Sequence, residues 1–267
     1  MPFTSILAFL VLGAVVGFAA GLLGVGGGLL LVPCFTFLFP SVGVPPERLV
    51  HMGIATSLAT IMFTSISSVV AHHRRDAVLW PIVKVLAPGI LVGSWIGPWI
   101  GKQLTSAALA MLFALFIAGF AMQMLLDKAP AASRELPGAA GMFAVGGGIG
   151  ILSGLVGVGG GFVSVPFMTW CNVRIHNAVA TSAALGFPIA LAGTLANVTY
   201  GMHTPGLPPG SLGFVYLPAL LIVSLASVLT APLGASTAHR LRVAALKRVF
   251  ALTMLALAGY MLTRAFR

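Results

Sequence analysis

Long apolar segments constrain this chain more than any other feature. Eight of them carry almost no charge, and they occupy residues 2–23, 52–71, 80–100, 106–126, 139–155, 178–200, 212–235 and 244–262. A helix needs about 20 apolar residues to cross about 30 Å of hydrocarbon. Only 7% of all residues are charged, too few to cover a water-soluble domain of this size. The sequence therefore predicts an all-α polytopic membrane protein whose main partner is the lipid bilayer.

The net charge of +10 does not indicate a nucleic-acid partner. Nucleic-acid binding needs a basic patch on a solvated domain, whereas the Lys and Arg residues here stand singly between apolar runs. Their placement is typical of charges that orient membrane helices.

An internal repeat divides the chain into two homologous halves. Residues 21–33 read GLLGVGGGLLLVP and residues 154–166 read GLVGVGGGFVSVP, identical at nine of thirteen positions. His51 begins HMGIATS and His176 begins HNAVATS. We predict a first repeat over 1–126, a polar linker over 127–138 and a second repeat over 139–267.

Loop charges predict that the two repeats are inverted. One loop of the first repeat holds Arg74, Arg75 and Lys84, and its counterpart GMHTPGLPPG holds no charge. The next loop reverses this bias, with Lys102 in the first repeat and with Arg240, Arg242, Lys247 and Arg248 in the second. Because basic residues mark the cytoplasmic side, each half is expected to be a glycine-broken helix hairpin plus three transmembrane helices. The linker would be cytoplasmic and both termini outside. Arg264 and Arg267 argue against an outside position of the C-terminus. The span count stays open at six, eight or ten.

Two glycine clusters interrupt the apolar segments. They comprise Gly24, Gly26, Gly27 and Gly28, and Gly157, Gly159, Gly160 and Gly161. Neither is followed by the Lys and Ser or Thr of a nucleotide-binding loop. Glycine costs a helix roughly 1 kcal/mol per residue, so a break is expected at each cluster, and the helix N-terminus that follows attracts anions. Close helix packing is the alternative interpretation.

Hydroxyl and amide side chains follow the glycine clusters as a second candidate set. Thr56, Ser57 and Thr60 share one face of a helix, Thr181 and Ser182 repeat the pair, and Asn197 adds an amide. Such groups bind oxyanions as donors, but membrane Ser and Thr also bond to their own helix carbonyls.

Two histidines occupy matching positions five residues before Thr56 and Thr181. His51 and His176 are candidates for gating or proton-linked residues, or else are interfacial side chains at helix starts. Arg48 and Arg174 lie nearby and would draw anions to the two mouths of the protein. The four acidic residues all fall in predicted loops, which disfavours a cation path. Neither a metal, a cofactor nor a catalytic group is expected.

The doubled G-L-x-G-V-G-G-G-x-x-x-V-P and the doubled A-T-S resemble the TauE/SafE family of sulfite and organosulfonate exporters, also called the toluene sulfonate uptake permease family. The resemblance spans nearly the whole chain. It implies transport of small sulfur-containing anions across the bacterial inner membrane, and it covers residues 24–28, Thr56, Ser57, residues 157–161, Thr181 and Ser182.

The sequence thus predicts a secondary transporter, an exporter by family, that moves a small oxyanion by alternating access. A passive anion channel and the membrane subunit of an ATP-driven importer are the alternatives. An intramembrane enzyme using Ser153 or a histidine lacks a matched nucleophile and base. The identity of the anion, the direction, the coupling ion and any homo-oligomer stay open.

Overall fold

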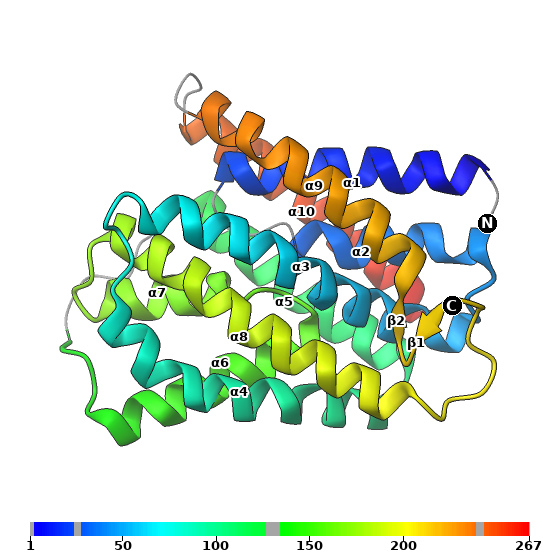
Figure 1. Ribbon diagram of the computed structural model, residues 1–267, viewed down its shortest axis with the longest axis horizontal. Coiled ribbons are helices and arrows are strands. Elements are labelled where there is room, and N and C mark those ends of the chain that lie inside the picture. The colour runs from blue at the N-terminus through cyan, green and yellow to red at the C-terminus, as the bar shows by residue number, and fades with distance from the viewer. Residues whose placement is uncertain (1–2, 24–27, 127–133, 239–242, 267) are drawn as a thin grey trace.

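The protein is a helical bundle in the computed structural model, which describes residues 3–23, 28–126, 134–238 and 243–266 (Figure 1). The helices are α1 Phe3–Leu23, α2 Gly28–Leu38, α3 Leu49–His73, α4 Trp80–Gln103, α5 Ser106–Leu126, α6 Ala139–Val156, α7 Gly161–Trp170, α8 Ile175–Gly201, α9 Leu217–Ala238 and α10 Val243–Ala265. Short 3-10 turns cover Phe39–Val42 and Pro46–Arg48. The expected helical fold class is confirmed.

Within the described residues, six helices are long and apolar enough to cross a membrane: α1, α3, α4, α5, α6 and α8. Their outer faces suit lipid, as do those of the remaining helices. On α9, Leu221, Leu225 and Leu229 recur every four residues and are 65%, 64% and 66% exposed. Such a row of exposed leucines would be costly in water but is satisfied by acyl chains. The chain is an integral, multi-pass membrane protein.

One expected helix starts later than the apolar pattern indicates. The apolar run begins at residue 212, but Ser211–Leu212 pairs as an antiparallel strand with Val215–Tyr216, and α9 begins only at Leu217. The turn needs glycine, since Gly210 and Gly213 have φ of +85° and +55°, where a Cβ is strained. This small hairpin is an addition to an otherwise helical fold.

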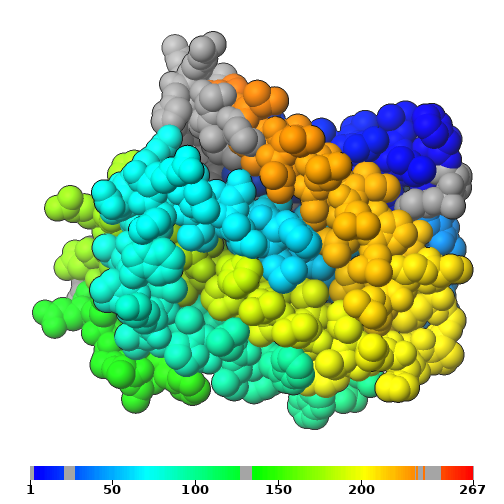
Figure 2. Space-filling view, viewed as in Figure 1, coloured from blue at the N-terminus to red at the C-terminus, as the bar shows by residue number. Residues whose placement is uncertain are grey.

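Helices from the two halves of the sequence pack against each other throughout. The first helix of each half lies along the fourth helix of the other, so that α1 packs on α9 and α6 on α4. The third helices, α3 and α8, are in contact, as are the fifth, α5 and α10. Figure 2 shows one outcome: α3, α4, α8 and α9 together form a single surface.

Glycines allow α4 and α6 to approach closely. Gly89, Gly93 and Gly97 of α4 face the backbone of α6, while Gly146 and Gly150 of α6 face that of α4. A methyl group at Gly150 would lie 2.5 Å from the carbonyl oxygen of Ile90 and 2.7 Å from the amide nitrogen of Ser94. Small residues in this spacing are typical of tight helix pairs in membranes.

We predict that Gly150→Ala destabilises the protein, because the added methyl group has to push two backbones apart. Overpacking of this kind costs about 1–3 kcal/mol. The measurement is the thermal midpoint in detergent. Gly148→Ala is the matched control, since Gly148 lies on the same helix but a methyl group there meets no atom within 4 Å. Equal midpoints for the two variants would show that a methyl group fits at position 150 and that the close approach of α4 and α6 does not determine the stability of the protein.

Candidate functional site

Each half of the chain contains a hairpin of two helices joined at a glycine cluster. In the second hairpin α6 ends at Val156 and α7 begins at Gly161. Gly157 and Gly160 have φ of +77° and +75°, a region that only glycine adopts without strain. The expected break is present here. In the first hairpin α1 ends at Leu23 and α2 begins at Gly28, and Gly24, Gly26 and Gly27 lie outside the described residues.

The inner ends of the two hairpins meet inside the bundle. A methyl group at Gly28 would lie 3.3 Å from the Cα atom of Val158 and 3.4 Å from the carbonyl oxygen of Gly157. From this point α2 and α7 run outward to opposite ends of the molecule (Figure 1). Both helices therefore begin near the same place, and the first N–H groups of a helix have no acceptor within it. Together the two N-termini carry about one unit of positive partial charge.

Ile61 of α3 packs against both hairpin ends, which the sequence did not indicate. Its Cδ1 atom is 2.6 Å from the position of a methyl group at Gly28, and its Cγ2 atom is 3.4 Å from that at Gly159. Ile61 is only 3% exposed. A buried aliphatic side chain therefore lies against both hairpin ends.

Ser153 is a second residue of this region to which the sequence analysis assigned no binding role. It lies in the last turn of α6, is fully buried, and its hydroxyl has no hydrogen-bond partner in the described part of the chain. The hydroxyl oxygen is 3.2 Å from where a methyl group at Gly160 would lie, directly before α7. An unpaired buried hydroxyl is costly, and this one lies beside the start of α7.

Two serines of the doubled A-T-S motif also reach the hairpin elements. Ser57 donates a hydrogen bond of 2.8 Å to the carbonyl oxygen of Gly157. Ser182 accepts one of 2.8 Å from Ser164 of α7, and both of these hydroxyls are buried. The motif therefore lies beside the hairpin, as the repeat suggested, and its hydroxyls already have protein partners in this conformation.

The two threonines of that motif make equivalent contacts across the halves. Thr56 of α3 accepts a hydrogen bond of 3.1 Å from the backbone N–H of Tyr216, directly before α9. Thr181 of α8 accepts one of 3.0 Å from the N–H of Leu79, directly before α4. Each hydroxyl thus accepts a hydrogen bond from a backbone N–H directly before a helix of the other half. Thr60 bonds within α3, to the carbonyl of Thr56. A role of these residues as substrate ligands stays a prediction.

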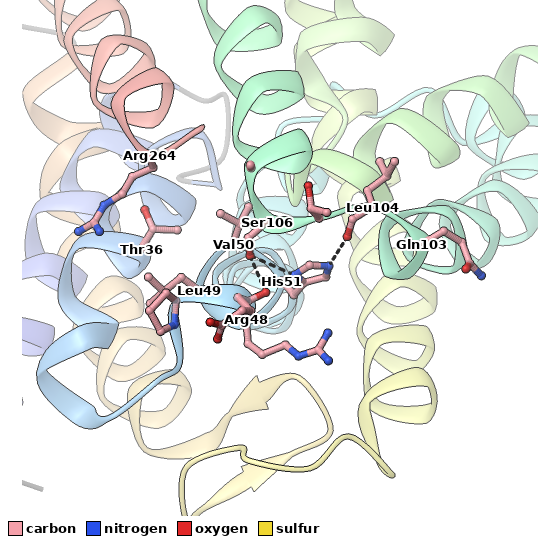
Figure 3. A pocket seen from close by; sticks show the side chains of 13 residues that line it. Thr36, Arg48, Leu49, Val50, His51, Gln103, Leu104, Ser106 and Arg264 are labelled. Carbon is pink, nitrogen blue, oxygen red and sulfur yellow. Dashed lines mark hydrogen bonds between the residues drawn. The ribbon is translucent and has the colours of Figure 1, made fainter. Parts of the chain in front are cut away.

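The remaining candidates lie away from the hairpin ends. Asn197 donates to the carbonyl of Gly193 in its own helix and shares a small cavity with His51. The His51 Nε2 atom is 3.2 Å from the carbonyl oxygens of both Gly101 and Leu104, at the end of α4. Figure 3 shows the contact with Leu104. His176 is exposed at the start of α8. The two matching histidines therefore have different environments.

The arrangement suits transport better than catalysis. Two broken helices meet in the interior of a membrane bundle, a design found in secondary transporters. The fold and the site together define a polytopic membrane protein of the transporter class.

The family follows from sequence comparison. Residues 9–261 match the family described as Sulfite exporter TauE/SafE, and the chain belongs to this family.

Several curated proteins are similar over most of their length. A probable membrane transporter protein of Haemophilus influenzae is 38% identical over 96% of this chain and 97% of its own. Another, from Methanocaldococcus jannaschii, is 29% identical over 84% and 83%. A third, from Xylella fastidiosa, is 28% identical over 100% and 98%. No solved structure matches the chain significantly.

We predict that Thr181→Val destabilises the protein, because it leaves the N–H of the half-buried Leu79 without its acceptor. The expected loss is about 1–3 kcal/mol, measured as a lower thermal midpoint in detergent, and Thr181→Ser should restore most of it. Thr64→Val is the control, since the Thr64 hydroxyl bonds only to Ile61 in its own helix. A midpoint for Thr181→Val that equals the control would contradict the bridging role.

Proposed function

We propose that the protein is a secondary transporter of a small sulfur-containing oxyanion, such as sulfite or an organosulfonate, in the bacterial inner membrane. The observation that carries this proposal is the meeting of two broken hairpins at Gly28, Gly157 and Val158. The family's description as sulfite exporters supplies the substrate class. In this proposal the anion binds between the N-termini of α2 and α7 and is released by alternating access.

An inverted repeat is the second part of the proposal. In it, α1–α5 and α6–α10 are equivalent sets related by a pseudo-twofold axis in the membrane plane. The exchanged packing of α1 on α9 and of α6 on α4 supports this relation. The paired contacts of Thr56 with Tyr216 and of Thr181 with Leu79 support it independently, since equivalent residues bond to equivalent positions.

The chemistry of the hairpin ends favours an anion. Helix N-termini present N–H donors and positive partial charge, and the hydroxyls of Ser153 and Ser57 add donors beside them. None of the helices α1 to α10 contains an acidic residue within the described part of the chain. Glu47 lies in the 3-10 turn before α3, at the end of the bundle. A cation would therefore find few ligands along this route.

The arrangement of charge favours a cytoplasmic location for one end of the bundle. Arg74, Arg75, Lys84, Arg134 and Arg174 lie at the end opposite the termini, whereas Arg48, Lys102 and Arg264 lie at the termini end. By the positive-inside rule, the termini would face outward and the linker the cytoplasm.

The position of Ile61 favours a carrier over a passive channel. A channel needs a continuous path, whereas here the two hairpin ends are in contact and the buried Ile61 packs against both. Binding of an anion would require Ile61 of α3 to move relative to the hairpin ends. Such coupling of substrate binding to a shift of one element against another is what alternating access requires.

Proteoliposomes test the function directly. We expect saturable flux, and exchange against internal unlabelled anion, for one or more of sulfite, sulfoacetate, thiosulfate and sulfate, measured with and without a pH gradient. Gly159→Leu should abolish this flux while the protein still inserts, because the side chain fills the gap beside Ile61. Gly148→Leu is the control on an exposed, open position. Unchanged flux in Gly159→Leu would remove the hairpin site, and non-saturating flux would favour a channel.

A second variant tests the position of Ile61. Ile61→Ala removes the aliphatic side chain that packs against both hairpin ends, so we expect tighter binding of the anion or faster exchange, by about threefold to tenfold. Binding and exchange are measured on the same proteoliposomes. Ile66→Ala serves as the control, because Ile66 lies on the same helix and is 49% exposed. A loss of binding in Ile61→Ala, with normal binding in the control, would show that Ile61 supports the site rather than fills it.

A further inference from the structure

His51 is a buried histidine that two cavities share. It lies in the first turn of α3 and is only 5% exposed. An outer cavity of about 560 Å³ lies at the end of the bundle where the termini are, and His51 forms part of its wall (Figure 3). A small inner cavity of about 10 Å³ is lined by His51 as well. Among the residues that the structure describes, His51 alone lines both of these cavities.

The outer cavity is open to water, and the inner one extends toward the second hairpin. Exposed residues, among them Glu47 and Gln103, line the outer cavity. Ile54 of α3 and Leu155 in the last turn of α6 line the inner cavity. The Cα atom of Ile54 is 2.9 Å from the position of a methyl group at Gly157, where the break begins. The volume of the inner cavity is about the least that one water molecule needs.

The hydrogen-bond partners of the His51 ring are all suited to accept. Its Nε2 atom is 3.2 Å from the carbonyl oxygens of Gly101 and Leu104, and a carbonyl only accepts, so Nε2 carries a hydrogen. Its Nδ1 atom is 3.4 Å from the hydroxyl oxygen of Ser106. That hydroxyl donates its own hydrogen to the carbonyl of Glu47 at 2.8 Å, which leaves a lone pair for Nδ1. A second proton on the ring therefore finds an acceptor in place.

The charged residues around the two cavities link a proton on His51 to an anion. In the described part of the chain, Arg48, Arg264 and Glu47 line the outer cavity and Lys102 lines the inner one. The lining residues of α5, α6, α8 and the turn between β1 and β2 carry no charge. The excess of positive charge attracts an anion, and an anion near His51 favours the imidazolium form. By linkage, a proton on His51 strengthens binding of the anion by the same factor.

We propose that His51 is a proton-binding site that couples proton movement to transport of the anion. Nδ1 accepts a proton from water in the outer cavity, and the ring becomes an imidazolium. Nε2 then gives its hydrogen to a water molecule in the inner cavity, so one proton has crossed the ring. The coupling rests on the proposed function, whereas proton binding does not. The matching residue His176 is exposed, so we assign this role to His51 alone.

The first test measures proton binding by NMR on the full-length protein, with isotope-labelled histidine, in nanodiscs. We expect one ring signal to change from neutral to doubly protonated between about pH 8 and about pH 5, where histidine titrates. The signal is assigned to His51 by its absence from His51→Gln. A His51 ring that stays in one protonation state over this range would overturn the proposal.

Ser106→Ala tests the acceptor at Nδ1 without changing His51. Loss of one hydrogen bond to the protonated ring should weaken proton binding about threefold to tenfold, seen as a lower pH midpoint of the His51 signal. Thr105→Ala is the matched control, because it removes the neighbouring hydroxyl, which bonds to the N–H of Ala108. Equal midpoints for the two variants would contradict the arrangement proposed here.

The second test measures coupling in proteoliposomes, with whichever of sulfite, sulfoacetate, thiosulfate and sulfate shows saturable flux. Liposomes without protein give the baseline. An acidic outside should drive anion accumulation in wild type. The readout is the ratio of this accumulation to exchange at equal pH, which His51→Gln should lower at least about fivefold, the usual size of a coupling between sites. His176→Gln is the matched control and should keep the wild-type ratio.

The outcomes separate the coupling from the proposed function. A ratio in His51→Gln that equals those of wild type and His176→Gln would overturn the coupling, as would wild-type flux that ignores the pH gradient. If His51→Gln carries no anion, Ser106→Ala decides, since its flux must shift in pH by the same factor as its NMR midpoint. Wild-type protein whose His51 titrates but which carries none of the four anions keeps the proton site and loses the transport function.

Discussion

The structure depends on how backbone groups are paired where helices end inside a membrane bundle. Lipid offers no hydrogen bonds, so an interrupted helix survives only if protein groups surround it. At the second hairpin the carbonyl of Ser153 accepts from the N–H groups of Gly157 and Val158, and the Ser57 hydroxyl donates to the carbonyl of Gly157. The break is thus enclosed by α3 and by its own helix. At the start of α7 the N–H groups of Val163 and Ser164 donate to the carbonyl of Gly160, whereas the Ser153 hydroxyl has no partner in the described part of the chain.

The same requirement explains how the two halves are joined. The helix starts at α4 and α9 each leave backbone donors, and a threonine of the opposite half accepts one of them. The packing of α4 on α8 and of α9 on α3 places these helix starts beside the central pair α3 and α8. Because each half completes the hydrogen bonding of the other, a shift of α3 would strain or break the hydrogen bond before α9. A shift of α8 would do the same to the hydrogen bond before α4. This is a physical route by which movement at the hairpin ends could reach the two faces of the bundle.

Much of the architecture was predictable because apolar length and glycine content act locally. A helix was expected to begin after each glycine cluster, and α2 begins at Gly28 and α7 at Gly161. The start of α9 was wrong by five residues, since the Gly210 and Gly213 turn allows a strand pair that apolar periodicity does not reveal. Thr56 and Thr181 were selected for their hydroxyls, but their backbone partners lie at least 100 residues away. Ile61 and Ser153 carry no local signal, because one is an ordinary aliphatic residue and the other a lone serine.

The sequence by itself determined that this chain is a membrane-embedded helical protein of two related halves, with breaks at defined glycines. It did so because a helix needs about 20 apolar residues to cross the membrane, and because every backbone N–H and C=O group inside the membrane needs a partner within the protein. Only the tertiary structure decided what lies at the breaks. The contact of Gly28 with Val158 and the packing of Ile61 against both hairpin ends depend on how the helices pack. Packing is a property of surfaces from distant segments, and neither hydropathy nor spacing along the chain encodes which surfaces will meet.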